Sequence, residues 1–149
     1  RLMQVVETDM TLFYRGLSKL DLNQQSPSQQ ALREALHSAW YQPGQISQDY
    51  LQQLKQWLQS YQQSLSAQAI RDKDRAQLMN SVNPQYVLRN YLAQLAIDKV
   101  VDGDNSLLHQ LHEVLRKPYD EQPGMEDFAA KRPEWARHKP GCSMLSCSS

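Results

Sequence analysis

The chain has 149 residues, and its 16 basic and 16 acidic side chains leave no formal net charge at pH 7. A chain of this length can bury the core of one domain. The balanced charge argues against a nucleic-acid binder, which usually carries a basic excess. The mean hydropathy of −0.69 and the lack of a long apolar run argue against a membrane span.

The first helical pattern is already present at Leu2, directly after Arg1. Apolar residues recur at helical spacing from there, and no capping residue precedes them, which predicts an uncapped helix over residues 2–19. We therefore expect the chain to be the C-terminal piece of a longer protein. A stand-alone chain that has lost its first residues is the alternative.

Three further helices are predicted in the first half of the chain. Ser26 as an N-cap and Pro27 at the first helical position indicate a second helix, which Pro43–Gly44 ends. Ser47 indicates the start of a third helix, where apolar residues again recur at helical spacing. The charged run 71–81 predicts a short fourth helix.

The strongest local signal is the pair Asn83 and Pro84, an N-cap followed by proline at the first helical position. An apolar stripe follows, and Gly103 is placed to end this fifth helix in a left-handed turn. Either Asp104 or Asn105 then caps a sixth helix.

After residue 117 the chain is punctuated by proline and glycine, with one possible helical turn near residues 125–131. No run of alternating apolar and polar residues predicts a strand. The expected fold is all-α, with about six amphipathic helices in a domain over residues 1–117. An irregular Pro-rich C-terminal arm over residues 118–149 is expected to lie over the surface.

Few residues indicate chemistry. The five glycines are scattered and form no phosphate-binding loop. His109 and His112 lie three residues apart on a predicted helix, but a zinc site needs further ligands, and a hydrolase built on them has no other support. His138 and the two cysteines could supply ligands on a tail, yet an ordinary surface is the simpler interpretation. We assign no metal site.

Cys142 and Cys147 are the two cysteines, and both lie within the last eight residues. Nothing can therefore cross-link the body of the chain, which argues against a disulfide scaffold and favours a reducing, intracellular compartment. Arg89 falls beside the apolar stripe of the fifth predicted helix. It is either exposed or an anchor for a carboxylate or carbonyl.

Residues 79–91, MNSVNPQYVLRNY, resemble the NPxxxLRN segment of the selenoprotein O family. The matching residues are Asn83, Pro84, Leu88, Arg89 and Asn90.

Two more segments follow in the order of that family. Pro118, Tyr119 and Asp120 resemble its L-x-x-P-Y-D segment, and the ending around Cys147 is similar to its C-terminal Cys-Ser-Ser. In some animal members selenocysteine stands where Cys147 stands here. The resemblance covers the second half of the chain.

The resemblance implies a protein-kinase-like fold, of the pseudokinase type, and protein adenylyltransferase (AMPylation) activity. The family moves AMP from ATP to Ser, Thr or Tyr side chains of proteins, with Mg²⁺ or Mn²⁺. Its glycine-rich loop and its ATP- and metal-binding residues belong to upstream segments, and Asp127–Phe128–Ala129 lacks the glycine of its metal-binding motif. We therefore assign no catalytic or cofactor-binding residue to this chain. Its expected partners are the upstream kinase-like region and the protein substrates, in a bacterial cytoplasm.

The resemblance also implies that Cys147 is a redox element, able to pair with a cysteine of the catalytic part. Cys142, five residues away, adds a local partner that would compete for it. Two inert thiols are the simpler alternative. The alternative for the whole chain is an independent helical protein-interaction module with a redox-sensitive tail.

Overall fold

The computed structural model describes residues 2–22, 26–66 and 70–142. Within these ranges the chain forms α-helices and short 3₁₀ helices, with no strand beyond an isolated β-bridge between Thr8 and Trp40. The all-α prediction is confirmed. The chain divides into two compact units, residues 1–83 (unit 1) and residues 84–149 (unit 2), and each is described by itself. No helix in the described ranges has the length and apolar character needed to cross a membrane.

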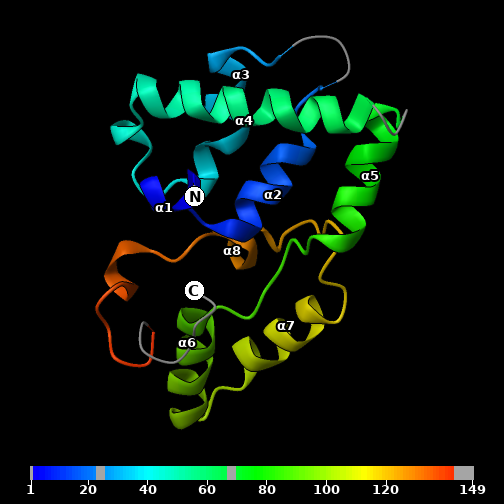
Figure 1. Ribbon diagram of the computed structural model, residues 1–149. Coiled ribbons are helices and arrows are strands. Elements are labelled where there is room, and N and C mark those ends of the chain that lie inside the picture. Colours follow the sequence, from blue (N-terminus) through cyan, green and yellow to red (C-terminus); the bar gives the residue numbers. More distant parts are fainter. Residues whose placement is uncertain (1, 23–25, 67–69, 143–149) are drawn as a thin grey trace. The chain divides into compact units, whose positions relative to one another are not determined.

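The described residues of unit 1 form five α-helices and two 3₁₀ turns, which enclose an apolar core. Figure 1 shows how these helices are arranged. The helices are α1 (Leu2–Val5), α2 (Met10–Ser18), α3 (Gln29–Leu36), α4 (Gln48–Ser66) and α5 (Asp72–Val82), and the 3₁₀ turns are His37–Ala39 and Pro43–Gln45. The long helix α4 packs against α1 and α3, while α2 packs against α3 and α5. The core side chains that are least exposed include Trp40, Tyr50, Phe13, Leu32 and Leu58.

The helix predicted over residues 2–19 is wrong in one respect, because the structure breaks it into α1 and α2. Asp9 is the N-cap of α2, and its carboxylate accepts a hydrogen bond from the Leu12 N–H at 3.0 Å. Before the cap, the Asp9 N–H donates to the Ala39 carbonyl at 2.8 Å and the Tyr41 N–H donates to the Glu7 carbonyl at 3.1 Å. These partners lie some 30 residues away, so no local pattern could show them.

The second helix begins later than predicted and ends earlier. Ser28, rather than Ser26, is the N-cap of α3 and accepts from the Ala31 N–H at 3.1 Å. The Ser26 hydroxyl instead donates to the side chain of Gln62 at 3.3 Å, which removes it from the capping role. The other two predictions for unit 1 are confirmed: Ser47 caps the start of α4, and α5 forms within one residue of its predicted bounds.

Gly16 lies where α2 approaches α3 most closely. A Cβ built on Gly16 would stand 2.5 Å from the Ala35 carbonyl oxygen and 2.9 Å from Cδ2 of Leu36. Only glycine allows this approach, because any side chain would overlap with backbone atoms of α3.

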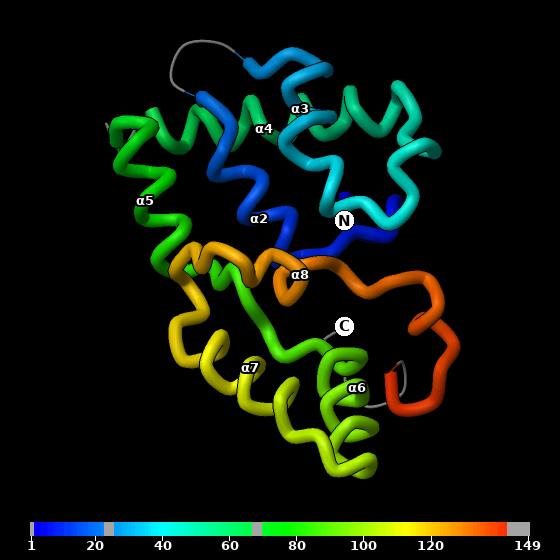
Figure 2. Tube along the Cα trace, turned by 180° about the vertical axis from the view of Figure 1, so that it is seen from behind, coloured from blue at the N-terminus to red at the C-terminus, as the bar shows by residue number. Residues whose placement is uncertain are grey.

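Unit 2 contains α6 (Asn90–Val101), α7 (Ser106–Leu115), α8 (Glu126–Ala129) and a 3₁₀ turn at Glu134–Ala136. Figure 2 shows α6 and α7 as a helical hairpin, and the chain after α7 returns to α6. Gly103 has φ of +85°, as its predicted left-handed turn requires. Of the two predicted caps for α7, Asp104 makes the bond, accepting from the Ser106 N–H at 2.8 Å.

The predicted start of the fifth helix is wrong, because α6 begins at Asn90 rather than after Asn83. Asn83 instead ends α5: its N–H and its side-chain amide both donate to the Met79 carbonyl, at 2.9 and 2.8 Å. Pro84 is followed by non-helical backbone up to Arg89. Asn83, which predicted a helix start, therefore lies at the end of α5, since an asparagine side chain can satisfy either kind of helix terminus.

The chain beyond residue 117 contributes to the core of unit 2. Ala136 and Cys142 are buried together with Tyr91, Leu92 and Leu111. The predicted helical turn near residues 125–131 is present as α8. Residues 118–142, expected to be an arm over the surface, thus supply side chains that α6 and α7 pack against.

Candidate functional site

Two of the three segments that carry the family resemblance contact each other in unit 2. The Pro118 carbonyl oxygen accepts hydrogen bonds from the N–H groups of Gln85 and Tyr86, at 2.7 and 3.1 Å. We call this contact, Gln85 and Tyr86 with Pro118, the motif junction. It keeps the backbone after Pro84 out of a helix, because both N–H groups bond to a partner outside any helix.

A buried tyrosine completes the motif junction. The Tyr86 hydroxyl lies 3.4 Å from the Gln122 carbonyl oxygen, to which it donates, and it accepts from the Gln122 N–H at 3.2 Å. The Gln122 side-chain amide donates in turn to the carbonyls of Val114 and Lys117, at 3.0 and 2.9 Å. Val114 lies in the last turn of α7 and Lys117 lies two residues beyond it, where carbonyls lack the i+4 N–H partner of a helix interior. Gln122 thereby ties the chain after α7 back to α7 itself.

Sequence reasoning missed both Tyr86 and Gln122. Tyr86 lies inside the NPxxxLRN run, but at one of its unspecified positions. Gln122 lies in the Pro-rich stretch, where no periodic pattern distinguishes a structural side chain from a solvated one. The available signal was that Tyr86 is an aromatic residue within the predicted fifth helix. The structure places Tyr86 before α6, which begins at Asn90.

The remaining described motif residues differ in their exposure and in their place in the fold. Leu88 and Tyr119 keep about half of their surface exposed, and Asp120 is exposed. Arg89 occupies the N-cap position of α6 without a side-chain capping bond, and Asn90 is the first residue of that helix. Pro118 thus joins the two motif segments through its backbone carbonyl.

A second polar cluster fastens the C-terminal segment to α6. Lys139 Nζ lies 3.1 Å from a carboxylate oxygen of Asp98, and the Gln94 amide donates to the other at 2.7 Å. Lys139 also lies over the Trp135 ring, 5.6 Å from its centroid. We call this cluster, Asp98, Gln94, Lys139 and Trp135, the arm clasp. The hydrogen bond from Gln94 and then the contact with Lys139 hold the pKa of the Asp98 carboxyl below its usual range.

Cys142 follows the arm clasp, three residues after Lys139. It is buried and has no disulfide partner among the described residues. Gly141, with φ of +82°, lies so close to Gln94 that a Cβ would overlap its side-chain amide. The Tyr91 hydroxyl also donates to the Ala130 carbonyl at 3.3 Å. Cys142 is therefore a core residue of unit 2. Cys147, the other redox candidate, lies outside the described residues.

The histidines predicted as weak metal candidates lie on the surface. His109, His112 and His138 are all exposed, and His112 has the Glu113 carboxylate 3.5 Å from its Nδ1. No three His, Cys, Asp or Glu side chains gather at metal-binding distance within the part of the chain that the structure describes. Asp127–Phe128–Ala129 lies within the short helix α8.

In unit 2, hydrogen bonds thus join two motif segments, and the arm clasp fastens residues 135–139 to α6. Comparison with known proteins identifies the family of the chain. The family model described as "Protein adenylyltransferase SelO" matches residues 1–116. The chain belongs to the SelO family. The SelO match contains the NPxxxLRN segment and ends shortly before Pro118, so it takes in all of unit 1 together with α6 and α7.

Curated relatives match the chain over almost its whole length. The chain is 53% identical to a protein nucleotidyltransferase YdiU of Rhodopirellula baltica, 46% to one of Flavobacterium johnsoniae and 50% to one of Methylobacillus flagellatus. Each alignment covers 99% of this chain but 29%, 28% and 27% of the relative. The chain therefore spans less than a third of the length of these relatives.

Proposed function

We propose that this chain is a supporting segment of a protein adenylyltransferase, which transfers AMP from ATP to Ser, Thr or Tyr hydroxyls of other proteins. The observation that carries the proposal is the SelO family match over residues 1–116, together with relatives named protein nucleotidyltransferase. The expected setting is the bacterial cytoplasm, and the expected partners are the kinase-like region of the longer polypeptide and its protein substrates.

The reaction needs a nucleotide and a divalent cation, which we propose bind elsewhere in the longer polypeptide. An ATP-bound Mg²⁺ or Mn²⁺ is usually held by carboxylate or amide oxygens that converge on one point. No group of three His, Cys, Asp or Glu side chains gathers at one point among the described residues, and we propose none of them as a ligand. When bound, the cation would neutralise charge on the phosphates. We derive no step through it on this chain.

The role we propose for the present residues is architectural. The motif junction fixes the non-helical backbone after Pro84, and Tyr86 and Gln122 fasten it to the end of α7. A site on a rigid support keeps its geometry better than one on a loop, because its supporting shell does not move. The described motif residues support this interpretation through backbone and hydroxyl bonds rather than through convergent titratable groups.

We also propose that Cys147 is the redox-active thiol and that Cys142 is a packing residue. Cys142 is buried in the core of unit 2, where a thiol exchanges slowly because a partner cannot reach it. Pairing of Cys147 with another cysteine of the polypeptide would release two electrons and two protons to a thiol oxidant. Non-reducing peptide mapping of the oxidised full-length protein should give a disulfide that contains Cys147, with Cys142 still a thiol. A Cys142–Cys147 disulfide would contradict this assignment.

The proposed activity is tested on the full-length protein. It is incubated with ATP, Mg²⁺ or Mn²⁺ and a cell lysate, and the modified peptides are identified by mass spectrometry. We expect peptides that carry AMP on Ser, Thr or Tyr, and none when EDTA removes the cation. Phosphorylated peptides in their place, or no modified peptide from a folded protein, would contradict the proposal. The latter would favour the helical interaction module.

A further inference from the structure

Helix α6 has apolar side chains on more than the face that packs into unit 2. Tyr91, Leu92 and Ala96 are buried against α7 and the chain end. Ile97 and Val101, four residues apart on another face, are 56% and 81% exposed. Apolar side chains on a second face of a helix favour a contact there, because a solvated helix face is normally polar.

Two neighbouring side chains extend this exposed apolar surface. Val100 is 39% exposed, and Leu108, in the first turn of α7 beyond the connecting turn, is 47% exposed. We call Ile97, Val100, Val101 and Leu108 the α6–α7 apolar face. Figure 2 shows the short turn at which the two helices join.

The exposure of this face is not caused by fraying of the helix ends. The Gly103 N–H donates to the Val100 carbonyl at 3.0 Å, and the Asp104 N–H donates to the Lys99 carbonyl at 2.9 Å. Lys99 Nζ also lies 3.0 Å from the Asp104 carboxylate, which caps α7. Bonds on both sides of the turn hold the apolar side chains in place, so a binding partner would meet an ordered surface with little entropic cost.

We propose that the α6–α7 apolar face is covered by the part of the longer polypeptide that this chain does not contain. The proposal rests on the proposed function only in that both place the chain within a longer SelO-family protein. The curated relatives carry roughly seven tenths of their length outside the segment that matches this chain. This outside part of the polypeptide supplies the surface that covers the α6–α7 apolar face. That covering surface is apolar, with polar groups at its rim.

The size of the face favours an occupant in the same polypeptide over a second copy. Four partly exposed aliphatic side chains present far less area than the roughly 800 Å² per partner that a stable complex buries. A covalently linked segment needs less area, because linkage raises its effective concentration to about the millimolar range. The charged neighbours Lys99, Asp102 and Asp104 would then lie at the rim, where water still reaches them.

The test measures how fast a cysteine placed on this face is alkylated in the full-length protein. Val101→Cys and Ile97→Cys probe the face, and Gln110→Cys is the matched control, since Gln110 is exposed on the far side of α7 from Leu108. Maleimide labelling is followed by peptide mass spectrometry and normalised to the rate in denaturant. We expect Val101→Cys and Ile97→Cys to be labelled at least roughly tenfold more slowly than Gln110→Cys, a difference of about 1.4 kcal/mol.

Three results would overturn the proposal. Equal labelling of the face and the control would show that nothing covers the face. Protection that disappears on hundredfold dilution would assign the cover to a second copy. Protection of the same size in the 149-residue chain alone would assign the cover to this chain. The labelling needs neither ATP nor a protein substrate, so its outcome is independent of whether AMP transfer is found.

Discussion

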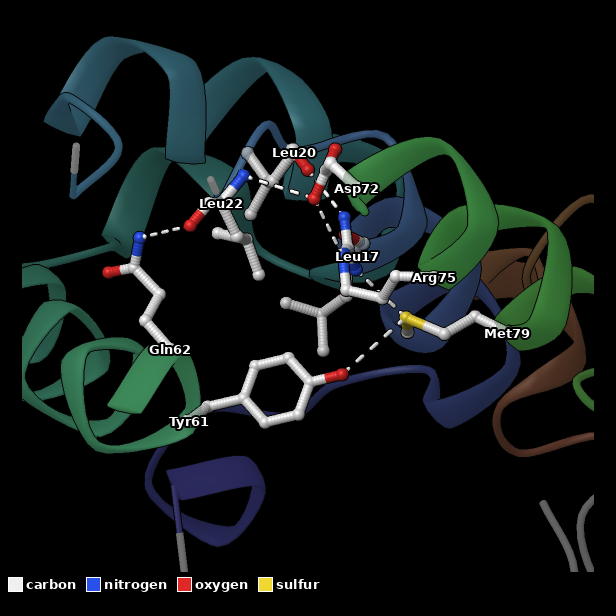
Figure 3. A network of polar contacts seen from close by, with 8 residues as sticks. All are labelled: Leu17, Leu20, Leu22, Tyr61, Gln62, Asp72, Arg75 and Met79. Carbon is white, nitrogen blue, oxygen red and sulfur yellow. Dashed lines mark hydrogen bonds and ion pairs between the residues drawn. The ribbon is translucent and has the colours of Figure 1, made fainter. Parts of the chain in front are cut away.

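Arg15 and Arg75 each donate to backbone carbonyls at the C-terminal end of the other's helix. Arg15 of α2 donates to the Asn80 carbonyl in the last turn of α5, at 3.3 Å. Arg75 of α5 donates to the Leu20 carbonyl, just beyond α2, at 2.6 Å, as Figure 3 shows. Both arginines are buried. Each guanidinium supplies partners and positive charge where a helix end has unpaired carbonyls and a negative dipole end.

Loss of Arg75 should therefore destabilise unit 1 strongly. Its guanidinium also pairs with the Asp72 carboxylate at 2.8 Å, so Arg75→Met removes the cation from a partly buried carboxylate and a donor from the helix-end carbonyls. We expect the free energy of unfolding to fall by about 3 kcal/mol. The control is Arg71→Met, which removes an exposed pair with Asp74 and should change little. Urea unfolding followed by circular dichroism checks this, and equal midpoints for the two variants would contradict it.

Gly16→Ala should destabilise unit 1, although alanine is the better helix former. The added methyl group would stand 2.5 Å from the Ala35 carbonyl oxygen, a backbone atom that cannot move aside cheaply. We expect a cost of about 1–3 kcal/mol. Gly44→Ala is the control, because its Cβ would meet nothing within 4 Å, and its effect should stay within about 1 kcal/mol. Thermal unfolding of both variants measures the difference in stability between them. A Gly16→Ala variant as stable as Gly44→Ala would be inconsistent with the close approach.

Gly141→Ala should release the chain end from α6 and expose Cys142. Gly124→Ala is a matched control: both glycines have positive φ and would pay about 1–2 kcal/mol for a side chain there. A Cβ at Gly141 would also overlap Gln94, whereas at Gly124 it would meet nothing. In a Cys147→Ser background, thiol labelling of Cys142 should be at least roughly tenfold faster in Gly141→Ala than in Gly124→Ala. Similar rates would show that Gln94 does not constrain the chain end.

The arm clasp should loosen in acid. The pKa of the Asp98 carboxyl is lowered from 3.8 in the folded chain, by the Gln94 hydrogen bond first and then by Lys139. A lowered folded pKa contributes stability above the unfolded pKa, and this contribution is lost as the pH falls below 3.8 and through the folded value. The indole N–H signal of Trp135, followed by NMR, should shift in that range. The shift should be absent in Asp98→Asn, and an identical titration in that variant would exclude Asp98 as its source.

Local patterns predicted the helices whose ends are set by neighbouring residues. Ser47 and Gly103 are examples, since capping and a left-handed turn need only a few adjacent residues. Asn83 predicted a helix start but lies at a helix end, because the same side chain can satisfy either. The N–H groups that follow it bond to Pro118, 33 residues after Gln85, which no local pattern shows. Composition could not show that Cys142 is buried, because its cover comes from α6 and α7. The motif segments could be found from the sequence, but Gln122, which joins them, could not.

The central claim is that this chain supports AMP transfer by a longer polypeptide without performing the transfer itself. The most direct measurement compares the full-length protein with the 149-residue chain, each incubated with a protein substrate and ATP labelled at either the α- or the γ-phosphate. The account predicts that the full-length protein transfers the α-label and not the γ-label, and that the 149-residue chain transfers neither. Transfer of the γ-label by the full-length protein, or of the α-label by the 149-residue chain alone, would contradict it.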